Sequence, residues 1–189
     1  MLNIIAGTLS TGAPPVSPNS YESIATVNVG SGGAGTVSFT SIPSTFTHLQ
    51  LRGIAKQTGG SQQASFTLQI NGDTGANYAW HGLYGISSVT ATASVSDNLY
   101  REINFMTSTD TLDNAYSVFV MDFLDYASTN KNKTLRSLGG CNYNTNGGIH
   151  LQSGLWMNNT TAISSLTFTP GAGNFNQYSQ FALYGIKGS

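Results

Sequence analysis

Apolar and polar residues alternate with a period of two along much of the chain. In residues 47–55, "THLQLRGIA", Leu49 and Leu51 fall on one side of the chain and polar residues occupy the positions between and beside them. This alternation is typical of a strand with one buried face. No window keeps apolar residues at the i, i+3, i+4 and i+7 spacing of an amphipathic helix. The pattern therefore predicts an all-β protein.

Further strands are predicted wherever apolar runs stand between polar turns. They cover residues 23–29, 36–41, 64–71, 78–86, 100–106, 115–126, 133–143, 149–157 and 164–169. The turns between them, such as "NGDTGAN" and "NTNGG", consist of residues that tolerate positive φ or cap their own backbone. Short strands at this spacing indicate an antiparallel β-sandwich, and we expect a single domain of jelly-roll type. The segment 115–126 is apolar on both faces, which favours a central strand.

Two segments near opposite ends of the chain resemble each other. Residues 39–56 read "FTSIPSTFTHLQLRGIAK" and residues 168–187 read "FTPGAGNFNQYSQFALYGIK". Both pass a proline-bearing turn before an apolar strand, Gly-Ile and lysine. We predict that the two strands are neighbours in one sheet, and a chance match among β-rich segments is the alternative. The apolar positions change phase after Gly53, which indicates a β-bulge.

The first twenty residues differ from the rest. A small apolar cluster stands there, made of Leu2, Ile4, Ile5 and Leu9. The following "TGAPPVSPNS" is typical of an extended, semi-rigid spacer. We therefore expect residues 1–20 to form a docking arm that anchors the protein, and residues 21–189 to form the sandwich domain. An outer strand or a frayed terminus is the alternative for the arm.

Composition narrows the function. Charged residues make up only 8% of the chain, against about 25% in an average soluble protein. The net charge is −1 with no basic stripe, so we expect no nucleic-acid partner. The first residues lack the basic region of a signal peptide, and no segment approaches the roughly 20 apolar residues of a membrane helix. We expect synthesis in a cytoplasm and no membrane partner.

Metal and catalytic motifs are weak. His48, His81 and His150 have no metal-ligand spacing, and Cys141 is the only cysteine. Asp110 and Asp113 could share a cation, but their segment does not match a calcium-binding loop. We therefore expect no metal and no cofactor.

Acidic pairs are the other requirement for hydrolytic chemistry on sugars. Asp122 and Asp125 are three residues apart on a predicted strand, so their side chains point to opposite faces. With a turn at residues 129–132, Asp125 would lie opposite Arg136 and form an ion pair. The sequence does not predict an enzyme.

The stretch "NYAWHGLYG", residues 77–85, holds the densest aromatic cluster. Tyr78, Trp80 and Tyr84 fall on one side of the predicted strand. On an exposed strand such rings could stack on sugars, with Asn77 or Asp73 supplying hydrogen bonds. Core packing or a subunit contact is the alternative and the one that we favour.

Four stretches of the chain carry a resemblance to a known family: "NSYESIATVNVGSGGAGTVSFTSIPSTFTHLQLRGIA", "INGDTGANYAWHGLYG", "LDYASTNKNKTLRSLGG" and the terminal "QFALYGIKG". They resemble small virion proteins of tailed bacteriophages, most strongly those of marine and cyanobacterial phages. The resemblance covers the chain from about residue 19 onward and includes no catalytic motif. It implies a structural protein of the virion, called a knob or fibre-like protein, whose partners are a major capsid or tail protein.

Two functions follow as expectations. The first is a head-decoration, knob or short fibre protein of the virion, anchored by its N-terminal arm as a homotrimer. The alternative is a tail-fibre tip, a receptor-binding module that contacts carbohydrate on the host surface. A depolymerase enzyme is disfavoured by the scarcity of acidic residues, of which there are eight.

Overall fold

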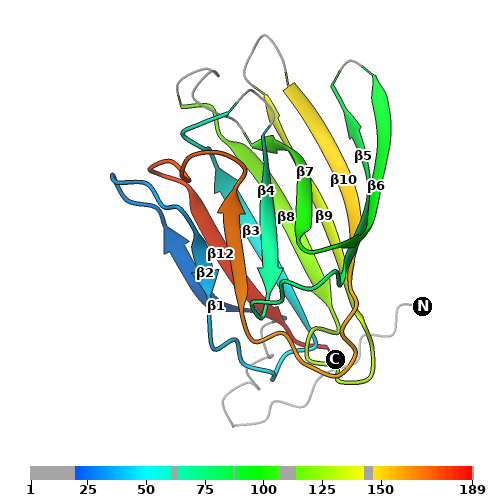
Figure 1. Cartoon of the computed structure of the whole chain (residues 1–189). Helices are drawn as coiled ribbons and strands as arrows, with labels where there is room; N and C mark the ends of the chain where they lie inside the picture. The colour runs from blue at the N-terminus through cyan, green and yellow to red at the C-terminus, as the bar shows by residue number, and fades with distance from the viewer. Residues whose placement is uncertain (1–19, 61–63, 87, 107–113, 143–146, 189) are drawn as a thin grey trace, which may run out of the picture.

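The chain folds as two stacked antiparallel sheets (Figure 1). The computed structural model describes residues 20–60, 64–86, 88–106, 114–142 and 147–188, and the arm residues Leu2, Ile4, Ile5 and Leu9 lie outside these ranges. Every element of the described residues is a β-strand. No helix among them is long and apolar enough to span a membrane. The predicted all-β antiparallel sandwich is confirmed, whereas the jelly-roll assignment stays a prediction.

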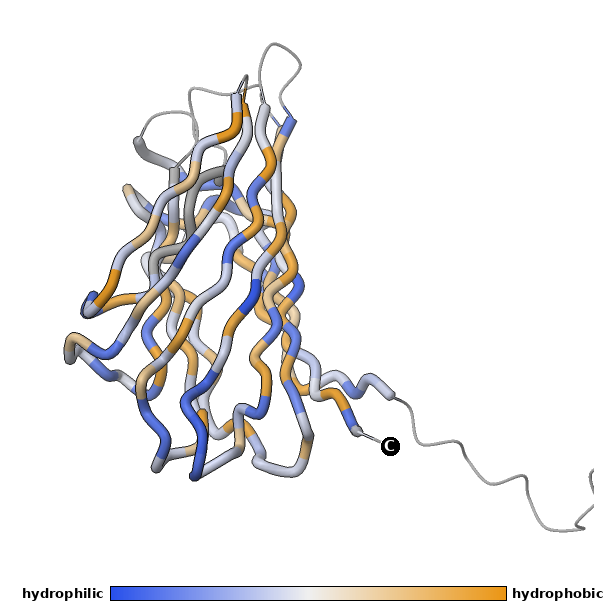
Figure 2. The backbone as a smooth tube through the Cα atoms, turned by 90° about the vertical axis from the view of Figure 1, so that its right-hand side faces the viewer, coloured by the Kyte–Doolittle hydropathy of each residue, from blue (hydrophilic) through white to orange (hydrophobic). Residues whose placement is uncertain are grey.

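The two sheets differ in width. The large sheet holds eight strands in the order β1 (Tyr21–Asn28), β12 (Gln180–Ile186), β3 (His48–Ala55), β8 (Ser117–Leu124), β9 (Lys133–Asn142), β10 (Gly147–Trp156), β5 (Tyr78–Gly85) and β6 (Val89–Asp97). The small sheet holds four strands in the order β2 (Val37–Phe39), β11 (Leu166–Pro170), β4 (Ala64–Ile70) and β7 (Tyr100–Met106). Hydrophobic and hydrophilic positions alternate along these strands (Figure 2).

The core lies between the sheets and is rich in aromatic rings. Phe66 and Phe168 of the small sheet meet Phe119 and Phe181 of the large sheet, with ring centroids 4.9 Å apart for Phe66 and Phe119 and 5.9 Å apart for Phe168 and Phe181. Phe175, in the loop before β12, packs on Phe181 at 4.9 Å. All five rings are at most 5% exposed. Aromatic pairs at these separations stabilise a core beyond the area that they bury.

The two similar segments are indeed neighbours. Strand β3 pairs with β12 in an antiparallel register that sets Leu51 opposite Leu183. The predicted bulge at Gly53 is wrong, because the pairing of β3 with both neighbours runs without a register shift. Gly53 faces the core, where the ring of Phe119 lies over it, and the following Ile54 faces outward. Gly185 of β12 is covered in the same way by the ring of Phe46.

The order of strands confirms one expectation and shows one omission. Strand β8 is central, between β3 and β9, as its apolar residues on both faces indicated. Strand β6 was not predicted from the sequence. It is one of the two edge strands of the large sheet, and most of its residues are exposed on both faces. Its Ser, Thr and Ala residues therefore lack the alternation of apolar and polar residues by which a strand is predicted from the sequence.

Candidate functional site

The outer face of the large sheet, which points away from the small sheet, carries many exposed apolar side chains. In β8 the residues alternate between buried and exposed, so Val118 and Val120 face outward while Phe119 and Met121 enter the core. Eight of these outward-facing apolar residues lie in two adjoining rows, with exposed fractions from 37% to 76%: Ile54, Leu83, Val89, Val118, Val120, Leu138, Ile149 and Leu151. We call these eight residues the apolar band.

Strand pairing arranges the apolar band in two rows that cross the strands. The first row contains, in order, Ile54, Val118, Gly140, Ile149, Gly85 and Val89. The second row contains Arg52, Val120, Leu138, Leu151, Leu83 and Ala91. Neighbours in each row stand directly opposite each other across a strand pair, close enough for their side chains to touch. The band is therefore one continuous surface.

Polar residues bound the apolar band on two sides. The guanidinium of Arg52 lies over the rings of Tyr21 and Tyr184, at 5.5 and 5.4 Å from their centroids. A third row runs beside the second: Gln50, Asp122, Arg136, Ser153, His81 and Ala93. In it Asp122 accepts hydrogen bonds from Arg136 Nη2 at 2.7 Å and Gln50 Nε2 at 2.8 Å. Asp122 and Arg136 thus neutralise each other, whereas Arg52 contacts two tyrosine rings and the Gln50 side chain.

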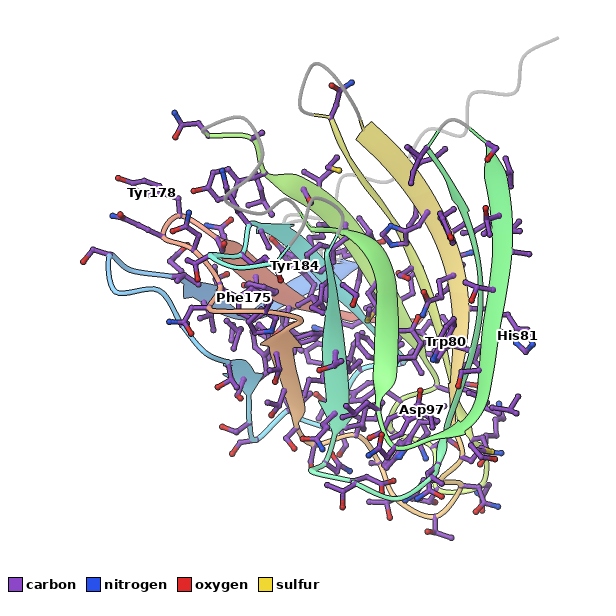
Figure 3. The ribbon with its side chains drawn as sticks, turned by 45° about the horizontal axis from the view of Figure 1, so that its top comes forward. Trp80, His81, Asp97, Phe175, Tyr178 and Tyr184 are labelled. Carbon is purple, nitrogen blue, oxygen red and sulfur yellow. The ribbon has the colours of Figure 1, made fainter. Side chains whose placement is uncertain are left out.

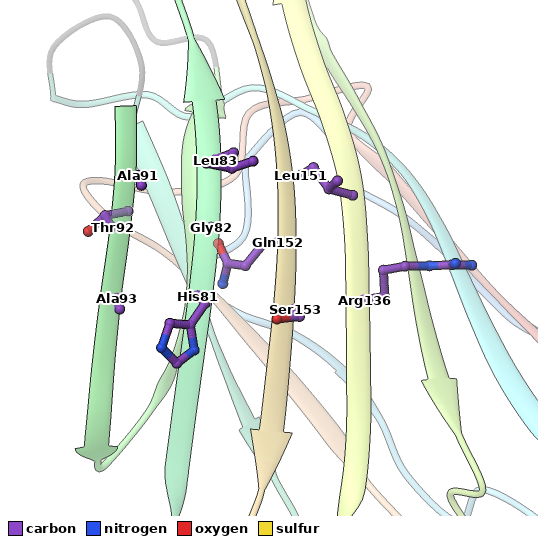
Figure 4. A pocket seen from close by; sticks show the side chains of 10 residues that line it. All are labelled: His81, Gly82, Leu83, Ala91, Thr92, Ala93, Arg136, Leu151, Gln152 and Ser153. Carbon is purple, nitrogen blue, oxygen red and sulfur yellow. The ribbon is translucent and has the colours of Figure 1, made fainter. Parts of the chain in front are cut away.

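Two open hollows lie on this face. One, of about 1030 Å³, has Val118, Leu138, Gly140 and Ile149 in its lining. The other, of about 610 Å³, crosses from β6 to β9 and combines Leu83 and Leu151 with polar residues of the third row (Figure 4). An added Cβ at Gly85 would meet nothing closer than 3.8 Å. The face is therefore uneven, with glycine positions beside protruding side chains.

The aromatic cluster predicted from the sequence lies on the inner side instead. Tyr78 is 0% exposed and Trp80 is 8% exposed, so burial excludes both rings from a surface contact with a sugar. Tyr84 is half-buried and packs against the core. Trp80 points between the sheets and His81 points away from them (Figure 3). Core packing, the alternative that the sequence favoured, describes Tyr78 and Trp80.

Asp73 is also part of this internal structure. Its carboxylate accepts hydrogen bonds from Trp156 Nε1 at 2.7 Å, from Asn77 Nδ2 at 3.0 Å and from the backbone nitrogen of Gly75 at 2.8 Å. Burial raises the pKa of Asp73, but these hydrogen bonds outweigh it and hold the pKa below the ordinary value. The hydroxyl of Tyr78 donates to the Asp73 carbonyl at 3.2 Å, and burial raises the pKa of Tyr78 to about 12. The Asp73 and Asn77 side chains thus stabilise a loop.

A buried lysine lies on the other side of Trp156. Lys133 is 0% exposed, and its Nζ lies 5.6 Å from the centroid of the Trp156 ring. The ammonium donates to the carbonyl oxygens of Asn158 at 2.8 Å and Lys131 at 3.2 Å. Burial lowers the pKa of Lys133. Because its hydrogen bonds go to backbone oxygens, Lys133 ties together the turns at this end of the sheet.

The ion pairs of the β8–β9 hairpin differ from the expected one. Arg136 lies opposite Asp122 and binds it, not Asp125. The reason is the register: Leu124 pairs with Thr134, so the turn begins at Asp125, which has a φ of 51°. Asp125 instead binds Lys131 at 2.7 Å, and that hydrogen bond lowers its pKa. The expectation that Asp122 and Asp125 do not converge holds, since Asp122 lies in the sheet and Asp125 in the turn.

The remaining candidates are the acidic pair at Asp110 and Asp113 and the histidines. Asp110 and Asp113 lie outside the described residues. Within the described ranges, no group of three or more His, Cys, Asp and Glu residues could hold a metal ion. His81 faces outward in the third row, whereas His150 is 5% exposed on the inner side. The histidines are thus not brought together.

Comparison of the chain with protein-family models, with curated proteins and with solved structures gave no match. Only the geometry of the structure therefore marks the outer face as a candidate functional site. A sequence signal for it existed: segment 115–126 is apolar on both faces, and "LGG" and "GGIHL" carry large apolar residues next to glycines. In the sequence this pattern indicated only a strand buried on both sides.

Proposed function

We propose that this protein is a structural component of a bacteriophage virion that works by binding other virion proteins. The apolar band is the observation that carries the proposal. Soluble proteins that work alone rarely expose apolar patches above a few hundred Å². The eight residues of the band have exposed fractions that add up to more than four whole residues, on the order of 700 Å². Such a surface is typical of a protein that functions in an assembly.

Two further features support this role. The chain resembles small virion proteins of tailed phages in the stretches quoted above. The carboxylates of Asp73, Asp122 and Asp125 each accept hydrogen bonds from neighbouring side chains or backbone, so these acids serve the fold. We infer a head-decoration, knob or short fibre protein that binds a major capsid or tail protein through residues 1–20 and has no enzymatic activity. The homotrimer stays a prediction.

The test is to quantify the protein in purified virions of the phage that encodes it. We expect it to remain with the particles through density-gradient purification, at tens to hundreds of copies for a decoration protein. A full-length variant with Leu2, Ile4, Ile5 and Leu9 all changed to Ser should fold normally but be lost from the particles. The matched control changes four exposed polar residues of the sandwich. Absence of the wild-type protein from particles would overturn the proposal.

The receptor-binding alternative rests on the smaller hollow. It combines apolar side chains with the hydrogen-bonding groups of His81, Arg136 and Ser153, a mixture that suits a sugar ring with its hydroxyl groups. Binding of host surface polysaccharide, lost on Arg136→Ala and retained on Lys131→Ala, would favour this function. Lys131 is the control because it is an exposed cation that binds Asp125 in the turn.

A further inference from the structure

The geometry points to a second copy of this chain as the occupant of the apolar band. In this pair the outer faces of two copies lie against each other. The two-fold axis lies between the two faces, runs parallel to the strands and passes over the boundary between β9 and β10. The inference goes beyond the proposed function and holds whether or not the protein belongs to a virion. Self-association through one patch related by a two-fold axis is the commonest form of protein oligomer.

The size of the band fits this occupant. Its exposed area, on the order of 700 Å², is close to the roughly 800 Å² that each partner contributes to an interface of standard size. Two sheets can pack face to face at about 10 Å, with their side chains between them, as they do inside a β-sandwich. The described residues leave this face uncovered, with Ile149 69% exposed and Leu138 58% exposed.

The order of residues in the rows makes the face complementary to itself. The axis sets β9 against β10 of the partner and β8 against β5 of the partner. In the first row Ile149, which stands between the two glycines Gly140 and Gly85, then faces the hollow that Gly140 and Ile149 of the other copy line together. Val118 faces Gly85 in the same way. A large residue thus meets a glycine at each of these positions.

The second row agrees with the same axis. Leu138 faces Leu151 of the other copy, and Val120 faces Leu83. Because twisted sheets pack at about −30°, contacts close to the axis are retained and those at the ends of the rows diverge. Leu138, Leu151, Gly140 and Ile149 are nearest to the axis. They are the residues on which the pairing depends most.

The charged residues of the third row do not oppose the pairing. The same axis sets Arg136 opposite Ser153 and Asp122 opposite His81 of the other copy. No like charges meet there, and Arg136 already neutralises Asp122 within each chain. A surface rich in one sign of charge would repel its own copy. This face is close to neutral, which suits a second identical chain.

Sedimentation equilibrium of the full-length protein tests the pairing. We expect the wild type to form two-chain species at micromolar concentration. Leu138→Glu and Leu151→Lys should each weaken pairing by about 100-fold or more, because each buries an uncompensated charge at the axis. Thr169→Glu is the control, since Thr169 is exposed on β11 of the small sheet, on the opposite side of the sandwich from the band. Circular dichroism confirms that each variant folds.

A mixing experiment tests the position of the axis. Leu138→Glu chains mixed with Leu151→Lys chains should recover pairing, because Glu then faces Lys across the axis. Leu138→Glu chains mixed with Leu138→Lys chains should not recover it. Recovery in the second mixture and not in the first would overturn the axis proposed here.

Three other outcomes overturn the inference. They are a wild type that stays single at high concentration, a three-chain species unaffected by Leu138→Glu, and a pair lost only when Leu2, Ile4, Ile5 and Leu9 become Ser. The last would show that the arm, and not the sandwich, occupies the band. Failure here leaves the virion assay untouched, and absence from virions leaves the pairing untouched, so the two proposals fail separately.

Discussion

The two faces of the large sheet use the same kinds of residue in opposite ways. On the inner face, glycines lie beneath aromatic rings from elsewhere in the chain: Gly53 beneath Phe119, Gly154 beneath Tyr100 and Gly185 beneath Phe46. On the outer face, the atoms nearest to the Cβ positions of Gly85 and Gly140 belong to backbone and aliphatic side chains. The chain therefore covers its inner face by itself and leaves the apolar band of its outer face exposed.

This difference shows that apolar residues of one strand can lie either in the core or on the exposed face. Phe119 and Val118 are neighbours in β8, yet Phe119 is 5% exposed and Val118 is 56% exposed. An apolar side chain buried inside the chain stabilises the single molecule, whereas an exposed one can stabilise only an assembly in which it becomes buried. The following predictions test whether the energetic division is as sharp as the geometric one.

The largest effect is expected from Phe119→Ala. Its ring covers Gly53 and packs on Phe66 and Phe181, so its loss leaves a cavity, and we expect the free energy of unfolding to fall by about 3–5 kcal/mol. Val118→Ala, one residue earlier on the outer face, should change it by less than about 0.5 kcal/mol in the single chain. Urea unfolding at low protein concentration measures both. Equal losses would show that the outer face is also part of the core.

Next in size are alanine substitutions of glycines. A Cβ at Gly53 or Gly154 would overlap the ring above it, so we expect each substitution to lower the free energy of unfolding by about 1–3 kcal/mol. Gly85→Ala has room for its Cβ and should be neutral or stabilise by up to about 0.5 kcal/mol, since alanine suits a strand better than glycine. Thermal unfolding of the three variants decides. A loss at Gly85 as large as at Gly53 would contradict the contrast.

These glycines show how far the sequence predicts the fold. Alternation located the strands, because a buried face leaves a period-two signal, and the similarity of residues 39–56 to residues 168–187 predicted the pairing of β3 with β12. The sequence pattern indicates a bulge at Gly53 because the apolar Ile54 follows it. The sequence does not reveal that the ring of Phe119 fills the space above Gly53. The pattern therefore gives no sign that Gly53 itself holds the core position and that Ile54 faces outward.

The candidate surface was less predictable for a related reason. An apolar residue in a sheet is compatible with the core of one chain or with an interface between chains, and periodicity is the same for both. The cluster at Tyr78 and Trp80 combines aromatic and polar residues, so the sequence left a sugar site open beside the favoured core packing, and the structure shows that the polar Asp73 and Asn77 stabilise a loop. Only the strand order assigns Leu138 and Leu151 to adjacent positions on the open face.

The contribution of a carboxylate should likewise depend on the partners that it binds. Asp73 accepts its hydrogen bonds from Trp156, Asn77 and Gly75, so Asp73→Asn should lower the free energy of unfolding by about 2 kcal/mol at pH 7. The pKa of Asp73 is lowered in the folded state, so its contribution is present above the unfolded value of 3.8 and is lost as pH falls through the folded pKa. The difference between the two proteins in urea unfolding should shrink in acid.

Asp125→Asn is the matched control for Asp73. Its carboxylate is 39% exposed and binds the exposed Lys131, so we expect a loss below about 1 kcal/mol. An Asp125 variant as unstable as the Asp73 variant would show that one ion pair with an exposed lysine contributes as much as three hydrogen bonds from the fold.

The smallest effect is expected from Arg136→Gln on the outer face. Arg136 is 65% exposed and Asp122 keeps its hydrogen bond from Gln50, so we expect the free energy of unfolding to fall by less than about 1 kcal/mol. A double-mutant cycle with Asp122→Asn, at low and high salt in the Leu138→Glu background, isolates the ion pair within a single chain. Salt should reduce the coupling. A coupling above about 2 kcal/mol would mean that the third row stabilises the single chain as strongly as groups of the core do. The outer face would then contribute to the stability of the single chain as well as to assembly.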